Sequence, residues 1–272
     1  GADIKIKFPK IISPLPISFE KFIPREMDPN TQITFGTTLQ ENIGLDKQYF
    51  GSSYDYKWSP KKTQNISFKL IDLEFVNNKN IENYFNVYKN SYDRLNEIAI
   101  NTVNTSQFMN SDGNLTIPDG ADSFIEKIQS GGLQLNNQSD LDRVNSIRER
   151  KQRLTTNNLI LGSSLSLNIN SQKSIIDEDF YQLKWKIEWV GNFLNRILEF
   201  SSEKNDEGKY TINGVSPSQY VKTEIDYIKH FQTGRDRILA FRFFGGIALP
   251  TGNSTNIPFS RSYFAGGAND NR

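Results

Sequence analysis

The chain has 272 residues, with 32 lysine and arginine side chains against 31 aspartate and glutamate, so its net charge is only +1. This balance gives no electrostatic case for nucleic-acid binding, and we expect no nucleic-acid partner. Cysteine is absent and His230 is the only histidine, which excludes disulfides, thiolate chemistry and metal sites that need two imidazoles from this chain. Aromatic residues make up 12% of the chain, too many for a disordered protein.

The N-terminal third predicts β-strands, because apolar and polar side chains alternate with a period of two. Residues 3–8, 33–39 and 52–58 each have one apolar and one polar phase. In residues 65–76 the apolar phase runs through even positions as far as Leu70 and through odd positions from Ile71. This shift predicts a β-bulge.

Residues 77–156 form a long, asparagine-rich connection with two helical stretches. Apolar side chains in residues 81–100 recur at the spacing of one helix face, and a short stretch near 124–128 does the same. Residues 110–114 faintly resemble a calcium loop but lack its terminal glutamate, which favours a turn. We therefore expect a long loop that carries a helix, and no metal site or cofactor.

The C-terminal half has the cleanest alternation, in residues 158–169, 180–189, 220–228 and 238–249. In the second of these strands one phase is Leu183, Trp185, Ile187 and Trp189, and the other includes Lys184, Lys186 and Glu188. Short polar connections at 59–63 and 233–236 predict tight turns, whereas 192–217 is long and charged. Together the patterns predict about eight antiparallel strands joined as a meander.

Two fold classes fit this alternation. In a soluble β-sandwich the apolar phase faces a shared core, and in a transmembrane β-barrel it faces lipid. The lengths of the apolar phases, the tryptophan and tyrosine residues near strand ends and the alternation of short and long connections favour the all-β transmembrane barrel. On that interpretation the lipid-facing residues are Leu183, Trp185, Ile187, Trp189, Val221, Ile225, Phe241 and Phe243.

Carboxylates lie on the polar phase of two of these strands, at Glu188, Glu224 and Asp226. A pair such as Glu224 and Asp226 could serve a glycosidase. Lysines intermixed with these carboxylates favour a charge-balanced lumen or solvated face instead. No nucleotide-binding or nucleophile motif occurs, so we predict no catalytic residue and no enzyme activity.

The last fifty residues carry a family resemblance. Residues 220–272 pass through Gly245-Gly246 and Leu249-Pro250 into a long loop that ends FAGGANDNR. This segment closely resembles the barrel of the BamA/TamA-type outer-membrane assembly factors, the bacterial surface antigen family, and is most similar to the TamL-like branch. The residues that match the family's loop motif are Phe264, Gly266, Gly267 and Arg272. Asn271 departs from the usual valine or isoleucine, and the sequence stops before the motif's next glycine and aromatic residue.

The resemblance implies that residues 1–272 are the central part of a sixteen-stranded outer-membrane β-barrel domain, incomplete in this chain. It implies a loop that begins near residue 250 and folds into the lumen, where Arg272 pairs with a wall carboxylate such as Glu188, Glu224 or Asp226. The implied function is non-enzymatic assembly or translocation of client outer-membrane proteins in a Gram-negative bacterium, with the bilayer and accessory assembly subunits as further partners. Long loops would be extracellular and short turns periplasmic. A secretion or surface-display barrel stays an alternative, as does a soluble sandwich that binds a ligand.

Overall fold

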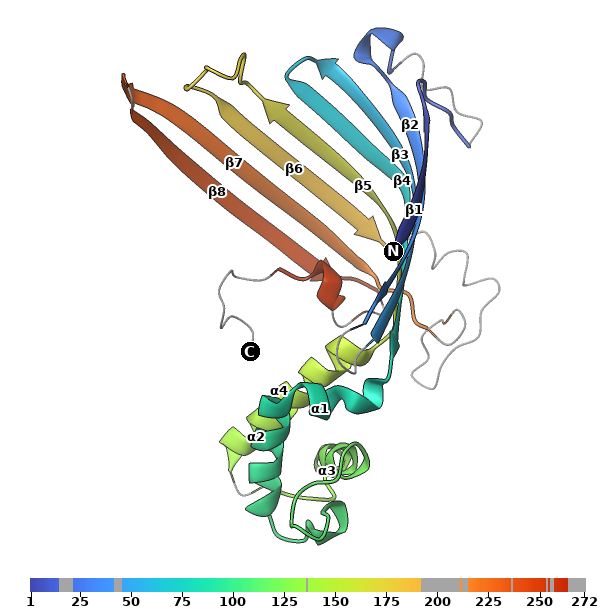
Figure 1. Ribbon diagram of the computed structural model, residues 1–272, viewed down its shortest axis with the longest axis vertical. Coiled ribbons are helices and arrows are strands. Elements are labelled where there is room, and N and C mark those ends of the chain that lie inside the picture. Colours follow the sequence, from blue (N-terminus) through green and yellow to red (C-terminus); the bar gives the residue numbers. More distant parts are fainter. Residues whose placement is uncertain are drawn as a thin grey trace. The chain divides into compact units, whose positions relative to one another are not determined.

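The computed structural model describes residues 1–14, 22–41, 46–135, 137–191, 211, 215–235, 237–252, 254 and 257–263. Eight strands form one sheet in chain order, and the strand pairs with a resolved register are antiparallel (Figure 1). The strands are β1 Ala2–Phe8, β2 Asn30–Gln40, β3 Asp46–Lys61, β4 Gln64–Lys79, β5 Asn158–Asn170, β6 Tyr181–Val190, β7 Tyr220–Gly234 and β8 Arg237–Pro250. The predicted meander of about eight strands is confirmed.

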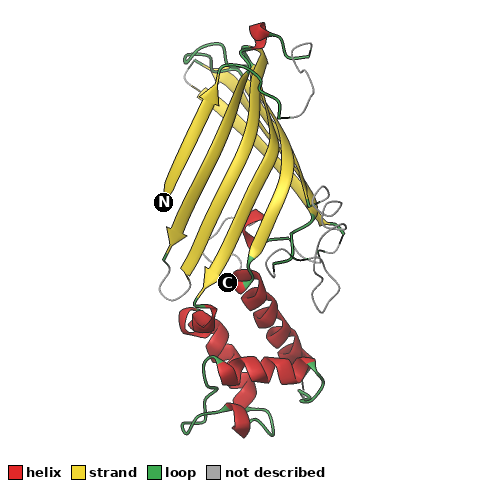
Figure 2. Cartoon of the chain, turned by 90° about the vertical axis from the view of Figure 1, so that its right-hand side faces the viewer, coloured by secondary structure: helices red, strands yellow, loops and turns green. Residues whose placement is uncertain are grey.

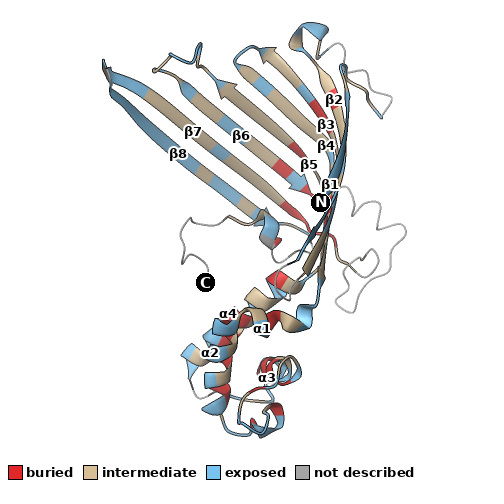
Figure 3. Cartoon of the chain, viewed as in Figure 1, coloured by how far each residue is buried: buried red, intermediate tan, exposed pale blue. Residues whose placement is uncertain are grey.

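The sheet is curved and not closed. In Figure 1 strands β5 to β8 cross the view while β1 and β2 are seen nearly edge-on, and Figure 2 shows the N-terminal strands side by side. Within the described residues β1 and β8 are the two edges. Strand β8 is exposed along nearly its whole length (Figure 3). A single sheet also differs from the two facing sheets that a sandwich needs.

The register of β5 to β8 gives the sheet two chemically different faces. Ile187 lies opposite Leu165 on one neighbour and Thr223 on the other, and Trp185 lies opposite Leu167 and Ile225. We call this side the apolar face; it also contains Leu183, Trp189, Val221, Tyr227, Leu239, Phe241, Phe243, Ile247 and Leu249. The opposite side is the polar face; it contains Ser164, Ser166, Lys184, Lys186, Glu188, Lys222, Glu224, Asp226 and Arg242.

Strand β4 supports the predicted change of phase. The ammonium of Lys69 lies 3.4 Å from the carboxylate of Asp72, although a regular strand directs residues three apart to opposite faces. The Ser163 hydroxyl on β5 also donates a 2.7 Å hydrogen bond to the Leu70 carbonyl, at the point where the phase shifts. The shift brings Asp72 and Glu74 onto the side where an arginine contacts them.

Two compact units make up the chain. One contains residues 1–38, 50–75 and 158–272, and the other contains 39–49 and 76–157. The second unit holds the helices α1 Tyr84–Val87, α2 Lys89–Ile100, α3 Asp119–Gln129 and α4 Gln138–Thr155, with short 3-10 turns at Ile81–Asn83 and Ser106–Phe108. This unit has a hydrophobic core formed by its own residues, built around Tyr84, Phe85, Leu95, Phe124 and Val144.

The helical unit is richer than the loop with one helix that the sequence predicts. Helix α2 falls within the first predicted stretch and α3 contains the second, which was predicted too short, but α4 was not predicted. Its buried residues are only Val144, Ile147 and Leu154, set among charged and polar side chains, so its apolar stripe is too narrow to stand out. No helix in the described part of the chain is long and apolar enough to cross a membrane.

Candidate functional site

After β8 the chain turns back and lies against the polar face of the sheet. The 3-10 turn η4, Phe259–Arg261, is closed by a 2.9 Å hydrogen bond from the Arg261 amide to the Pro258 carbonyl. Just before it, Ile257 packs against a buried apolar group formed by Ile160, Val190 and Tyr220. We call residues 258–263 the strap.

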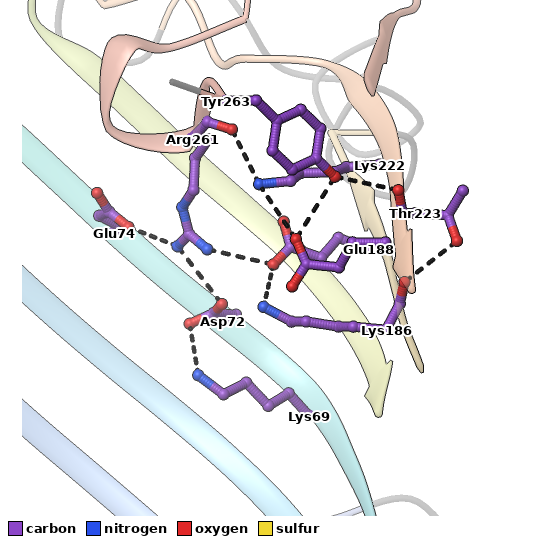
Figure 4. Close-up of polar contacts among 10 residues, drawn as sticks. Lys69, Asp72, Glu74, Lys186, Glu188, Lys222, Thr223, Arg261 and Tyr263 are labelled. Atoms are coloured by element: carbon purple, nitrogen blue, oxygen red, sulfur yellow. Dashed lines mark hydrogen bonds and ion pairs between the residues drawn. The ribbon is translucent and has the colours of Figure 1, made fainter. Parts of the chain in front are cut away.

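The side chain of Arg261 joins two strands of the sheet (Figure 4). Its Nη2 forms an ion pair with Glu74 on β4 and lies 3.6 Å from Asp72 on the same strand. Its Nη1 lies 3.4 Å from Glu188 Oε1 on β6. Glu74 and Glu188 are only 5% and 4% exposed. A planar guanidinium has enough donors to serve both carboxylates, which an ammonium does not do in fixed geometry.

Strand β5 runs between the two strands that Arg261 joins. Neighbouring strands lie about 4.8 Å apart, so the backbones of β4 and β6 are about 10 Å apart, and the side chains of Glu74 and Glu188 reach toward the guanidinium from both strands. Ser164, which is buried and directly opposite Glu188, is the polar-face residue of β5 at this level. Its small side chain leaves room for the guanidinium above the strand.

Tyr263 forms the second anchor of the strap. Its hydroxyl donates a 3.0 Å hydrogen bond to the Thr223 carbonyl and lies 3.4 Å from the Glu224 carboxylate. The Lys222 ammonium lies 4.2 Å from the centre of the tyrosine ring and donates a 3.0 Å hydrogen bond to the Arg261 carbonyl. Lys222 therefore contacts both Arg261 and Tyr263, the two residues that attach the strap to the sheet.

Electrostatics keep these two side chains in their hydrogen-bonding forms. Burial lowers the pKa of Arg261, but the carboxylates around it, Glu74 foremost, outweigh burial and hold that pKa above its ordinary value. Burial and the negative charge of Glu224 raise the pKa of the Tyr263 hydroxyl to about 12. Arg261 is thus a cation and Tyr263 a neutral donor throughout the physiological pH range.

The charges around the strap balance. Four cations, Lys69, Lys186, Lys222 and Arg261, contact four carboxylates, Asp72, Glu74, Glu188 and Glu224. We call these eight side chains the arginine cluster. Every cation in it has a carboxylate partner, so the cluster is suited to hold the strap on the sheet rather than to supply a free acid or base.

Gly246 leaves the room that the ring of Tyr263 occupies against β8. A Cβ atom at Gly246 would lie 2.5 Å from the ring and hydroxyl of Tyr263, whereas one at neighbouring Gly245 would meet its nearest atom, in Phe243, at an ordinary 3.5 Å. Gly246→Ala is expected to displace the Tyr263 ring and make the strap more accessible to protease, while Gly245→Ala leaves it protected. Limited proteolysis of the two folded variants measures the difference; equal cleavage of both would contradict this role for Gly246.

The sequence-predicted carboxylates have three different partners. Glu188 contacts an arginine, as the resemblance implies for a wall residue, but this arginine is Arg261. Glu224 contacts Tyr263 and lies 3.6 Å from Lys222. Asp226 forms a two-point ion pair with Arg242 on β8, at 2.8 and 3.0 Å. The predicted loop residues Phe264, Gly266, Gly267 and Arg272 lie outside the described residues.

The residues predicted to face lipid are brought together on the apolar face. Leu183, Trp185, Ile187, Trp189, Val221, Ile225 and Phe243 lie in laterally paired positions of β6, β7 and β8, and Phe241 lies two residues before Phe243 on the same face of β8. Sequence reasoning missed Asp72, Glu74, Arg261 and Tyr263. The two β4 carboxylates could have been found from the sequence. The shift of the alternation at Leu70 places Asp72 and Glu74 on the same face of the sheet as Lys69.

Two other sequence features have local partners. The Asn110 side-chain oxygen accepts hydrogen bonds from the amides of Asp112 and Asn114, which makes 110–114 a side-chain-stabilised turn. His230 stacks on Phe180 with ring centres 4.4 Å apart. Among the described residues, no group of three or more histidine or acidic side chains could hold a metal ion.

Comparison with known proteins adds no relative to these observations: no protein-family model matches the chain, and the search of curated proteins found no match.

Proposed function

We propose that the chain is part of an outer-membrane β-barrel that assembles or translocates other outer-membrane proteins without chemical catalysis. The observation that carries the membrane part of this proposal is the exposed apolar face. Trp185 and Trp189 are each 37% exposed, and Phe241 and Phe243 are more than half exposed. Large apolar side chains are exposed on one face of three neighbouring strands, β6 to β8, and in a membrane lipid would cover them.

The polar groups on the apolar face also suit lipid. The Trp185 indole N–H donates a 3.2 Å hydrogen bond to the Thr223 hydroxyl, which in turn donates to the Lys186 carbonyl at 3.2 Å. In water neither group would need a protein partner, because solvent would serve both. In hydrocarbon every donor must be satisfied internally, and this relay satisfies two of them.

The polar face and the strap support the assembly function. In the family that the sequence resembles, a loop folds into the lumen and an arginine fixes it to the wall. Here the strap is a chain segment that returns to the polar face, and Arg261 joins β4 to β6 beneath it. We propose that this contact holds the barrel wall in shape while an open edge of the complete barrel pairs with client strands.

Two alternatives have less support. A secretion or surface-display barrel would share the apolar face, and only its cargo would differ. A soluble β-sandwich would need a second sheet against the apolar face. The described residues form one sheet, with large apolar side chains exposed on β8.

Fractionation of cells that express the full-length protein tests the membrane part of the proposal. We expect the protein in the outer-membrane pellet after washing with alkaline carbonate, and in solution only with detergent. A protein that stays soluble without detergent after lysis contradicts the proposal. Depletion of the protein should then lower the amounts of other outer-membrane barrels; unchanged amounts would refute the assembly function and favour surface display.

The absence of cysteine makes the proposed topology directly measurable. Ser130→Cys lies in the helical unit and Lys62→Cys in the β3–β4 turn, and both positions are exposed. A membrane-impermeant maleimide is expected to label Ser130→Cys on intact cells, because the proposal makes 77–156 extracellular. Lys62→Cys is expected to react only after the outer membrane is opened. The reverse pattern would show the opposite orientation.

A further inference from the structure

Two isoleucines project from the connection between β5 and β6, residues 171–180. Ile175 is 99% exposed and Ile176 is 87% exposed. Single exposed apolar side chains are common, but turns favour Gly, Asn, Asp, Ser and Pro, and two adjacent β-branched residues suit a turn poorly. Local structure therefore gives no reason for isoleucine at these two positions.

The surrounding connection is held firmly in place. Asp177 accepts hydrogen bonds from the Lys173 amide at 2.9 Å and the Asp179 amide at 3.4 Å, which closes the turn around the two isoleucines. Ser171 accepts from the Tyr181 amide at 2.8 Å. On the other side, Lys229 of β7 forms an ion pair with Asp179. A tip held in this way loses little conformational entropy on binding.

Lipid is a poor occupant for this tip. Tyr181, at the first residue of β6, is an exposed aromatic side chain of the kind that marks the membrane interface. Three carboxylates, residues 177–179, separate it from Ile176 along the chain. Insertion of the isoleucines into hydrocarbon would carry these charges toward the bilayer, at a high desolvation cost. The tip therefore lies in water beyond the interface.

We propose that Ile175 and Ile176 form the anchor of a docking site for a protein with an apolar pocket bordered by lysine or arginine. The acidic residues 177–179 supply the charge that such a border complements. Glu178 is the most available of them, because its contact is a 2.9 Å hydrogen bond from the neutral Gln232 amide. The Asn170 amide, at the end of β5, donates a hydrogen bond to the Thr63 carbonyl of the β3–β4 turn. The site therefore lies at the same end of the sheet as that turn. The placement of the tip beyond the membrane interface and its compartment, the periplasm, both rest on the proposed function.

Photo-crosslinking in cells tests the site, with a benzophenone amino acid at position 176 of the full-length protein. We expect one protein adduct of defined mass that is absent when the same probe replaces Lys62, an exposed control position at the same end of the sheet. Ile175→Ser is expected to reduce the adduct about tenfold, because anchor residues supply a large share of binding free energy. Glu178→Lys should reduce it as well, whereas Lys173→Gln should not.

Each other outcome overturns the inference. Adducts with lipid alone would mean that the tip enters the membrane. An adduct that is equally strong from position 62 would mean that no specific pocket binds the isoleucines. An adduct that Ile175→Ser and Glu178→Lys leave unchanged would mean the same. Fractionation of the same cells keeps the two proposals apart: a protein that stays in the membrane without a specific adduct refutes the docking site alone, and a soluble protein refutes the membrane function alone.

Discussion

Replacing Arg261 with alanine is expected to lower the free energy of unfolding by about 3–5 kcal/mol, the usual cost of removing one partner from a buried ion pair. Glu74 and Glu188 would then lie almost fully buried without the cation that joins them. Like-charge repulsion between β4 and β6 would add to the desolvation cost. The measurement is the midpoint at which the full-length protein loses its compact form on heating or in denaturant.

Arg242 offers a matched control for this experiment. It also forms a two-point ion pair, with Asp226, but its side chain is 63% exposed. Arg242→Ala is expected to cost about 1 kcal/mol or less, because exposed ion pairs contribute little. Arg261→Lys should restore only part of the loss, since an ammonium does not reproduce contacts to two strands in fixed geometry. Equal losses at Arg261 and Arg242 would contradict a special role for the strap.

A double substitution separates the ion pair from simple packing. Glu188→Gln removes one of the carboxylates that Arg261→Ala would leave without this cation. If charge is the cause, the two substitutions together should cost less than the sum of their separate effects, by about 1–3 kcal/mol for groups in one network. Additive effects would instead mean that Arg261 acts through packing of its hydrocarbon stem.

Residues 264–272 follow Tyr263, the last residue of the strap, directly in the chain. The resemblance assigns the loop motif Phe264, Gly266, Gly267 and Arg272 to this segment. If the chain has the proposed assembly function, loss of the strap contacts is expected to lower assembly of client proteins as well as stability. A variant that keeps its thermal midpoint but loses assembly activity would indicate that the strap positions this segment.

Strand number and face were predictable because they depend on local alternation. In β6 and β7 each apolar side chain is two residues from the next, so the pattern alone assigns Leu183, Ile187 and Val221 to one face. Register then follows from short turns such as Lys62-Thr63, which join β3 to β4. These features need no knowledge of distant parts of the chain.

The arginine cluster was not predictable in the same way. Arg261 lies in an irregular segment without a period, and its contacts with Glu74 and Glu188 connect residues 187 and 73 positions apart in the chain. The resemblance led to the expectation of an arginine against a wall carboxylate, but for Arg272. Helix α4 was missed for a related reason. Its three buried side chains belong to a core shared with α1, α2 and α3, and this packing cannot be read from the α4 segment alone.

Replacing Ile187 with arginine is expected to destabilise the protein by about 2–4 kcal/mol in a bilayer, if the residue lies near the membrane midplane. Ile187 lies on the apolar face, between Leu165 and Thr223 on its neighbours. A guanidinium there would be drawn into hydrocarbon with no carboxylate on the same face to pair with it among these neighbours. Unfolding in lipid vesicles, followed by the shift in denaturant midpoint, measures the cost.

The control places the same side chain on the other face of the sheet. Asn168 lies on the polar face, directly opposite Lys184 and two strands from Asp226. Asn168→Arg is expected to change stability by about 1 kcal/mol or less, because the new charge stays on the polar face and its repulsion from Lys184, directly opposite, is small for one cross-strand pair. The same pair of variants in detergent should differ less, since a micelle deforms around a charge more readily than a bilayer. If Asn168→Arg proved the costly substitution and Ile187→Arg the neutral one, the polar face would be the buried surface, and the membrane proposal would fail with it.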